Sequence, residues 1–234
     1  KRRLKVGFFS TGDELRSIGQ PLDDGCVYDS NRYTLFGMLN RLNVELHDFG
    51  VVKDDPDAMR AAFSQAAATC DAVITSGGVS VGEADYTKQI MRELGDVSFW
   101  KIAMRPGRPI AFGSIQGDQH RAVLFGLPGN PVSSFVSFEL FARPALRKMS
   151  GHTLPERLVV NVTAAAPFKR KPDGKEHFAR AIVSANNGSL GAVPVGAQGS
   201  HQLAATALAN ALVILPDGNS VEPGDTVRAL LLSF

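Results

Sequence analysis

Hydrophobic positions in the first 150 residues alternate between short apolar runs and stretches of helical spacing. The apolar runs are typical of strands and occupy residues 4–9, 44–52, 72–74, 97–104, 110–115 and 122–127. Between them, apolar residues recur every three or four positions in four predicted helices. Asp29 or Ser30 is expected to cap the first helix and Asp55, followed by Pro56, the second; the others begin at Tyr86 and near Pro131. This alternation predicts an α/β domain in which helices cover both faces of a mostly parallel sheet, a three-layer architecture.

The last of these helices is predicted to bury Val132, Phe135, Val136 and Phe141. Pro144 is expected to kink or restart it, because proline removes a helical hydrogen bond.

After Gly151 the pattern changes to short β-rich segments at 158–164, 177–183, 190–195, 211–215 and 226–232. Turn-forming pairs such as Asn187-Gly188 and Pro223-Gly224 separate them. The pattern predicts a second domain built as an antiparallel barrel or sandwich. We therefore divide the chain into an α/β domain at 1–150 and a β domain at 151–234.

Composition narrows the classes of function. The chain has 234 residues, 44% of them hydrophobic, and its 25 Lys and Arg nearly balance 23 Asp and Glu. Such a balance gives no global field for nucleic acid or a membrane surface. No apolar run approaches the about 20 residues of a membrane span and no signal peptide is visible, so we expect a cytoplasmic protein. The two cysteines and five histidines lack disulfide or metal-site patterns and are interpreted as structural.

A glycine-rich turn follows the third apolar run. Gly77, Gly78 and Gly82 stand between that strand and a predicted helix, where backbone N–H groups can converge on an anion. Glu83 and Asp85 add carboxylates, which favour a divalent metal beside a phosphate. The alternative is an ordinary strand-to-helix turn whose acids cap the helix.

Other loops are expected to share the same edge of the sheet, because ligands collect at the carboxyl ends of parallel strands. These loops begin at Ser10, at Lys53 and at Pro128, and together with the glycine turn they supply three acids, Glu14, Asp54 and Asp85. Acids in a phosphate site indicate Mg²⁺. The alternatives are that Asp54 belongs to a helix cap and that Glu14 is a solvated loop acid.

A basic cluster provides a second candidate. Strand alternation over 97–104 and the residues after it places Lys101 and Arg105 on one face, with Arg108 nearby after a Pro-Gly turn. Three cations within eight residues suit an oxyanion or pyrophosphate. The alternative is a solvated basic turn.

Six motifs in order resemble the MoeA/gephyrin E-domain family of molybdopterin molybdenumtransferases. They are FSTGDEL (9–15), YDSNR (28–32), GVVKDDP (50–56), TSGGVSVGEADY (75–86), KIAMRPGRP (101–109) and LPGNPVSS (127–134). QGSHQ (198–202) and LANALVILP (208–216) resemble the C-terminal β-domain of the same family. The resemblance implies a MogA-like molybdopterin-binding fold followed by a small β-barrel.

The resemblance also implies a reaction and its residues. Family members insert molybdate into adenylylated molybdopterin with Mg²⁺, releasing AMP and molybdenum cofactor. Asp85, Glu14 and Asp54 match the catalytic acids, and Asp85 and Glu14 the metal ligands. The substrate-binding positions are Gly77, Gly78, Ser80, Lys101, Arg105, Arg108, Pro128, Gly129, Asn130, Ser133, Arg180 and Ser200.

This chain departs from the family pattern in three places. Arg105 and Arg108 stand where lysines are usual, and Ala204-Ala205 where two serines are frequent. Family members also carry an N-terminal half that helps to build a homodimer, and this sequence does not contain it. As a hypothesis, we interpret the chain as a fragment that turns over poorly by itself.

Two other functions stay open from the sequence. A gephyrin-type scaffold would show an apolar groove in the β domain. A stand-alone molybdopterin adenylyltransferase would bind ATP, but such relatives lack the C-terminal β domain.

Overall fold

The computed structural model describes residues 2–79, 85–117, 120–186, 188–196, 198–199 and 202–232, with backbone only at 85, 86 and 186. It contains two compact units. The α/β unit comprises Lys1–Ile102 and Pro109–Pro155, and the barrel unit comprises Ala103–Arg108 and Glu156–Phe234. The short segment 103–108 thus leaves the α/β unit between two of its strands and returns to it.

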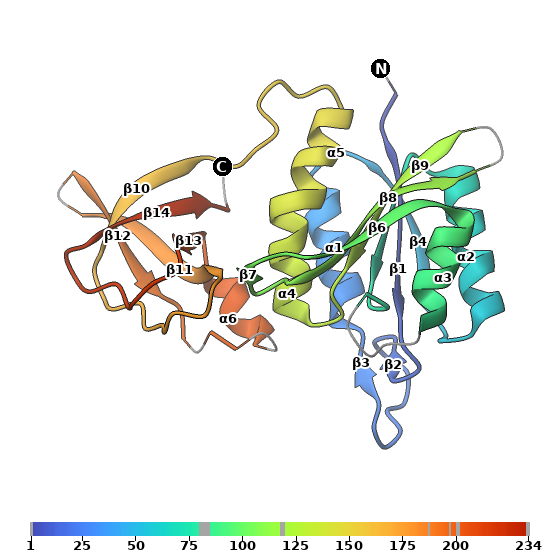
Figure 1. Ribbon diagram of the computed structural model, residues 1–234, viewed down its shortest axis with the longest axis horizontal. Helices are drawn as coiled ribbons and strands as arrows, with labels where there is room; N and C mark the ends of the chain where they lie inside the picture. Colours follow the sequence, from blue (N-terminus) through green and yellow to red (C-terminus); the bar gives the residue numbers. More distant parts are fainter. Residues whose placement is uncertain are drawn as a thin grey trace. The chain divides into compact units, whose positions relative to one another are not determined.

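A six-stranded sheet forms the middle layer of the α/β unit, in the order β4-β1-β5-β9-β8-β6 (Figure 1). Neighbours from β4 to β9 run parallel, whereas β8 and β6 are antiparallel. The predicted mostly parallel sheet is confirmed. The strand bounds are β1 Lys5–Thr11, β4 Glu45–Val52, β5 Ala72–Ser76, β6 Gly95–Lys101, β8 Pro109–Gln116 and β9 Arg121–Leu127.

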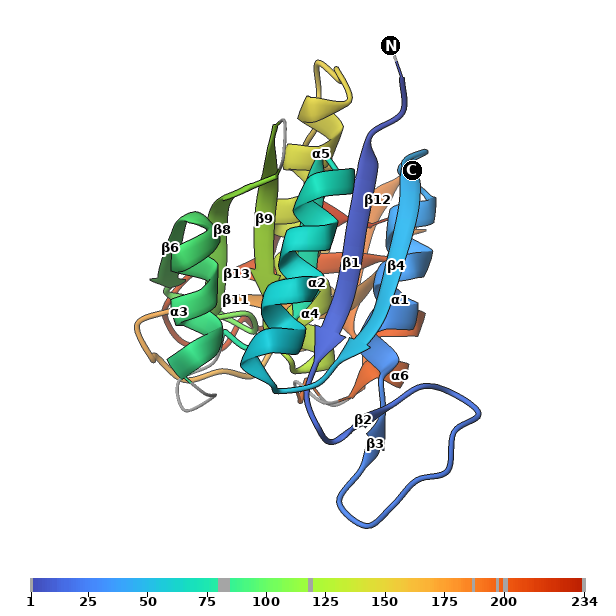
Figure 2. The same ribbon diagram turned by 90° about the vertical axis from the view of Figure 1, so that its right-hand side faces the viewer.

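Helices cover both faces of this sheet (Figure 2). α2 (Pro56–Thr69) and α3 (Asp85–Leu94) bury Phe63 and Met91 against one face. α1 (Ser30–Asn40) and the helical run α4 (Pro131–Ser137), η1 (Phe138–Ala142) and α5 (Arg143–Met149) pack against the other. The predicted caps form, because the Asp29 carboxylate accepts from the Arg32 N–H and the Asp55 carboxylate from the Ala58 N–H.

As predicted, the last helical run restarts at Pro144: a π-helical turn, η1, precedes it, and α5 begins at Arg143 with the proline in its first turn. A π turn holds more residues than an α turn and changes which side chains face the sheet. Phe138, the first residue of η1, is fully buried, whereas Phe135 and Phe141, predicted to be buried, are only half-buried.

The barrel unit closes a sheet on itself in the order β12-β10-β14-β13-β11, because β12 also pairs with β11. Its strands are β10 Val159–Ala164, β11 Glu176–Asn186, β12 Ser189–Pro194, β13 Ala211–Leu215 and β14 Thr226–Leu231. Small and branched side chains such as Val162, Ala181, Val213 and Ala229 fill the interior. The small C-terminal β-barrel that the family resemblance implies is confirmed.

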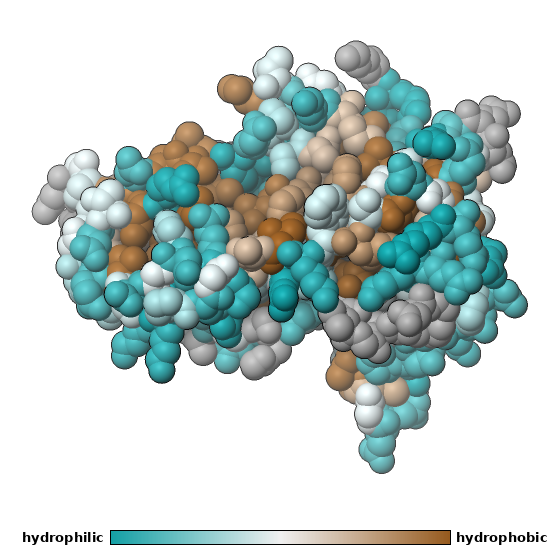
Figure 3. Space-filling view, in the orientation of Figure 1, coloured by the Kyte–Doolittle hydropathy of each residue, from teal (hydrophilic) through white to brown (hydrophobic). Residues whose placement is uncertain are grey.

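Four shorter elements complete the fold. β7 (Met104–Arg105) adds to the barrel sheet beside β11, and α6 (Leu203–Leu208) follows β12. β2 (Leu15–Arg16) and β3 (Val27–Tyr28) form a small parallel pair in the loop after β1. The surface of Figure 3 mixes hydrophilic and apolar side chains. None of the helices in the described part of the chain is long and apolar enough to cross a bilayer.

Candidate functional site

The parallel strands of the α/β unit present their carboxyl ends at one edge of the sheet. Thr11 and Ser76 are the last residues of β1 and β5, and Leu127 is the last residue of β9. We call the residues gathered around these ends the strand-end cradle; its members are Ser10–Gly12, Asn31, Ser76–Gly78 and Pro128–Gly129. As predicted, the loops after β1, β5 and β9 meet there.

Asn31 joins two of these loops. Its Nδ2 donates to Ser76 Oγ at 2.7 Å and to the Gly129 carbonyl at 2.6 Å, and Ser76 Oγ donates to the Pro128 carbonyl at 3.3 Å. Asn31 lies in the first turn of α1 and is only 8% exposed. Sequence reasoning gave this residue no role, although a polar residue four positions before the buried Leu35 falls on the inward face of the helix.

The glycine turn approaches β1 closely. Gly77 has φ +100° and Gly78 φ +69°, conformations that favour glycine. A Cβ on Gly77 would lie 2.6 Å from the Thr11 carbonyl oxygen, and the Gly77 N–H donates to the Leu127 carbonyl at 3.0 Å. The turn is therefore packed between the ends of β1 and β9.

Several buried oxygen atoms of the cradle lack a hydrogen-bond partner among the described residues. They include Thr11 Oγ1, Asn31 Oδ1 and, beneath the cradle, Asp29 Oδ2. The other oxygen of Asp29 accepts from Ser10 Oγ at 3.0 Å. Leaving a buried polar atom unpaired costs about 1–3 kcal/mol, so such a cluster calls for an explanation. A polar ligand in the cradle would supply the missing partners.

Two of the three predicted catalytic acids have described side chains, and both are exposed. The Glu14 carboxylate folds back over Gly12, where a Cβ would lie 2.6 Å from Glu14 Oε2. Asp54 follows β4, and its N–H donates to Asp13 Oδ1 at 3.1 Å. Asp85 begins α3, but its side chain lies outside the described part, as does the whole of Ser80.

These acids fit the chemistry of a magnesium site. Mg²⁺ commonly takes one or two carboxylates and completes its shell with water and substrate phosphates. Glu14 and Asp54 follow neighbouring strands, since Thr11 of β1 pairs with Val52 of β4. Among the described residues, no group of three or more His, Cys, Asp or Glu could hold a metal by itself.

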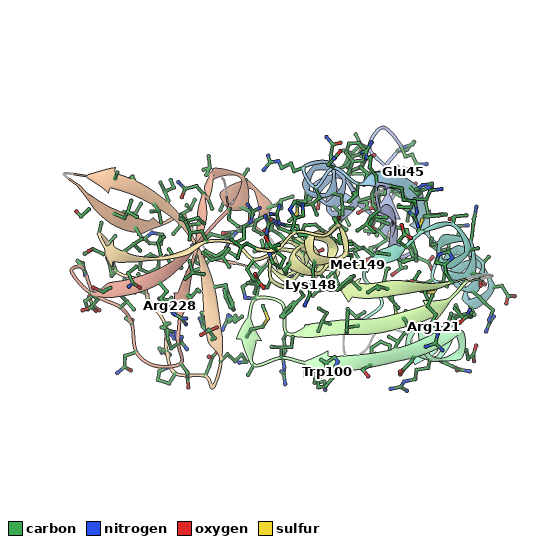
Figure 4. The ribbon with its side chains drawn as sticks, turned by 90° about the horizontal axis from the view of Figure 1, so that it is seen from above. Glu45, Trp100, Arg121, Lys148, Met149 and Arg228 are labelled. Atoms are coloured by element: carbon green, nitrogen blue, oxygen red, sulfur yellow. The ribbon has the colours of Figure 1, made fainter. Side chains whose placement is uncertain are left out.

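The predicted basic cluster is divided between the units. β6 ends at Lys101, just after the 58% exposed Trp100 (Figure 4), whereas Arg105 and Arg108 belong to the barrel unit. The expectation of one strand over 97–104 with Lys101 and Arg105 on one face was wrong. The Ala103 carbonyl accepts from the Glu176 N–H at 3.0 Å, and this hydrogen bond joins the segment after β6 to the start of β11. All three cations are exposed.

Of the other predicted binding residues, Pro128 is buried and Gly129 and Asn130 are exposed, with Asn130 at the N-cap of α4. Ser133 is buried in the first turn of that helix. Ser200 lies outside the described residues.

Arg180 is 1% exposed inside the barrel unit. Its guanidinium donates to the Gln202 carbonyl at 2.7 Å, to the Gly199 carbonyl at 3.1 Å and to Thr206 Oγ1 at 3.3 Å. Burial lowers its pKa. Arg180 thus supports the backbone on both sides of Ser200.

Comparison with known proteins identifies relatives along the whole chain. Residues 7–148 match the family described as "Probable molybdopterin binding domain", and residues 161–232 match "MoeA C-terminal region (domain IV)". The molybdopterin molybdenumtransferase of Haemophilus influenzae is 40% identical over 97% of this chain and 55% of its own length. That of Bacillus subtilis is 35% identical over 99% of this chain and 53% of its own.

Comparison with solved structures identifies the same family as the sequence comparison. Two crystal structures of the molybdopterin biosynthesis MoeA protein from Pyrococcus horikoshii superpose with TM-scores of 0.82 and 0.73, at 29% and 25% identity. They cover 100% and 98% of this chain, and 55% and 53% of their own chains. This chain spans about half the length of the curated relatives that it matches.

Proposed function

This chain belongs to the MoeA family of molybdopterin-binding proteins, and we propose that it is the part of a molybdopterin molybdenumtransferase that holds adenylylated molybdopterin while molybdate is inserted. AMP and molybdenum cofactor are the products. In the full-length protein we propose a homodimer, as the family resemblance implies.

The cluster of unpaired buried oxygens carries the proposal. Thr11 Oγ1 can donate to a phosphate oxygen, and Asn31 Oδ1 can only accept, for example from a pterin N–H. A phosphorylated pterin offers both kinds of group. The glycine turn lies at the same edge of the sheet, and the absence of side chains at Gly77 and Gly78 lets its backbone pack directly against Thr11 and Thr87.

The residues would divide the chemistry as follows. Asn31 and Ser76 keep the loops after β5 and β9 in fixed positions, so the bound substrate is oriented before reaction. Asp85 and Glu14 would hold Mg²⁺, which when bound neutralises charge on the pyrophosphate link, and Asp54 is the third acid of the site. Lys101, Arg105 and Arg108 offer positive charge to the oxyanions. An oxygen nucleophile bonds to one phosphorus, and the bridging oxygen leaves with the other phosphate.

A variant with opposite effects on folding and binding tests the cradle. Thr11→Val keeps the shape of the side chain but removes Oγ1, the unpaired buried atom. The variant should be at least as stable as the wild type in urea, because an unpaired polar atom disappears. Calorimetry should show adenylylated molybdopterin binding about tenfold more weakly, the effect of about 1.4 kcal/mol for one hydrogen bond. If the variant and the wild type bound adenylylated molybdopterin with equal affinity, the cradle would not be the pterin-binding site.

Activity provides the second test. Molybdate-dependent AMP release should be lost in the Asp85→Ala variant of the full-length enzyme, and unchanged release would exclude Asp85 from the mechanism. A chain that binds ATP tightly but not adenylylated molybdopterin would instead support the adenylyltransferase. The matched C-terminal region and the names of the relatives favour the molybdenumtransferase.

A further inference from the structure

Arg105 has an acidic neighbour that its sequence context did not suggest. Its Nη1 lies 3.7 Å from Asp173 Oδ2, and Asp173 stands in the loop between β10 and β11. The contact follows from the fold, since Arg105 of β7 pairs in register with His177 of β11. The Arg105 side chain is 69% exposed, whereas that of Asp173 is 23% exposed.

Asp173 is the centre of a cluster of basic side chains. His177 Nε2 lies 3.0 Å from its Oδ1, Lys175 Nζ 3.1 Å from its Oδ2, and Arg170 Nη2 3.5 Å from its Oδ1. Burial alone would raise the pKa of Asp173, but the hydrogen bonds from His177 and Lys175 outweigh it and lower the pKa to about 2. The carboxylate is therefore ionised at neutral pH.

The cations differ in how firmly they are held. Arg170 is 1% exposed and also pairs with Asp217 at 2.9 Å and donates to the Leu215 and Lys175 carbonyls. Arg105 is the outermost of the cluster and shows a single long contact to Asp173. An exposed ion pair of this kind is weak, so Arg105 can leave Asp173 at a cost of at most about fivefold in affinity.

We propose that Asp173 sets the affinity of Arg105 for a tetrahedral oxyanion, because it is the built-in counter-anion from which Arg105 must transfer when the oxyanion binds. The proposal rests on the role given above to Arg105 in the proposed function. After the transfer His177, Lys175 and Arg170 still surround Asp173, so the loop stays in place while Arg105 changes its partner. A guanidinium suits this exchange, since it binds carboxylate and oxyanion with the same donors.

Removing the charge of Asp173 should strengthen oxyanion binding. In water, two unit charges about 4 Å apart interact strongly enough to change an equilibrium constant about fivefold. Asp173→Asn keeps the shape of the side chain and should tighten binding of molybdate about fivefold in a titration of this chain at low salt. The gain should shrink as salt is added.

Matched variants separate this contact from general electrostatics. Asp217→Asn removes an equal charge from the same cluster without touching Arg105, and should change the affinity less than about twofold. In an Arg105→Gln background, Asp173→Asn should give no gain. Unchanged or weaker binding by Asp173→Asn, an equal gain in that background, or no binding by any of these proteins would each overturn the proposal.

A measurement on the wild-type chain covers the case in which the variants unfold. The side-chain NMR signals of Arg105 should shift when molybdate is added, and those of Arg170 should not; the reverse pattern would refute the exchange. Inorganic pyrophosphate in a parallel titration shows which oxyanion Arg105 prefers. Molybdate and pyrophosphate contain no pterin. A negative result with them therefore refutes the exchange of Arg105 between partners without testing the proposed pterin reaction.

Discussion

Replacing Gly77 with alanine should destabilise the α/β unit at the point where its ligand site is built. The residue has φ +100°, and strain of this kind costs about 1–3 kcal/mol for a residue with a side chain. The added Cβ would also lie 2.6 Å from the Thr11 carbonyl oxygen and 2.8 Å from its Oγ1, both at the end of β1. Because a backbone atom cannot move aside cheaply, we expect a total loss of about 2–4 kcal/mol.

Gly37→Ala is the matched control. Gly37 lies inside α1 and a Cβ there meets nothing within 4 Å, so the same substitution should stabilise the chain by about 0.5–1 kcal/mol. Urea unfolding followed by circular dichroism measures both variants. The reasoning fails if Gly77→Ala loses less than about 0.5 kcal/mol, or if the two substitutions change stability in the same direction.

Three further predictions concern single side chains. Asn31→Ala should lower the free energy of unfolding by about 2–3 kcal/mol, measured in urea, because it removes one buried and one partly buried hydrogen bond and leaves Ser76 and Gly129 with fewer partners. Burial raises the pKa of the Cys70 thiol, so iodoacetamide should label the half-buried Cys26 at least about tenfold faster than Cys70 in the native protein at pH 8, and equal rates would contradict the burial. The hydrogen bond from Arg2 lowers the pKa of Asp71; a lowered pKa gives stability that is present above the ordinary value near 4 and is lost as the pH falls below it. Asp71→Asn should therefore reduce the loss of stability on acidification from about pH 5 to about pH 3, and an unchanged slope would exclude this pair.

Local patterns predicted the layers of the α/β unit well. Asp29 and Asp55 cap helices where the sequence placed the caps, and β5 and β9 occur where short apolar runs predicted them. Each of these features depends on neighbours in sequence, on periodicity or on a capping side chain. The gathering of loops at one edge of the sheet then follows from parallel strands.

Features that depend on distant partners were not visible in the sequence. The role of Asn31 requires Ser76 and Gly129, which come from two other loops. Arg180 is a charged residue on a strand of the barrel, and such residues are usually exposed. It is buried instead, because three oxygen acceptors from residues 199–206 bind its guanidinium. No pattern within the strand itself indicates such acceptors.

Segment 103–108 shows most clearly why pattern alone was insufficient. Its two ends are fixed in the α/β sheet, where Lys101 of β6 pairs with Pro109 of β8, yet Met104 and Arg105 pair with β11 of the barrel. The β-forming pattern across residues 97–104 therefore contributes to two sheets, and periodicity cannot show where one strand ends. Arg105 therefore lies on backbone that pairs with β11, in a segment whose flanking residues Lys101 and Pro109 belong to strands of the α/β sheet.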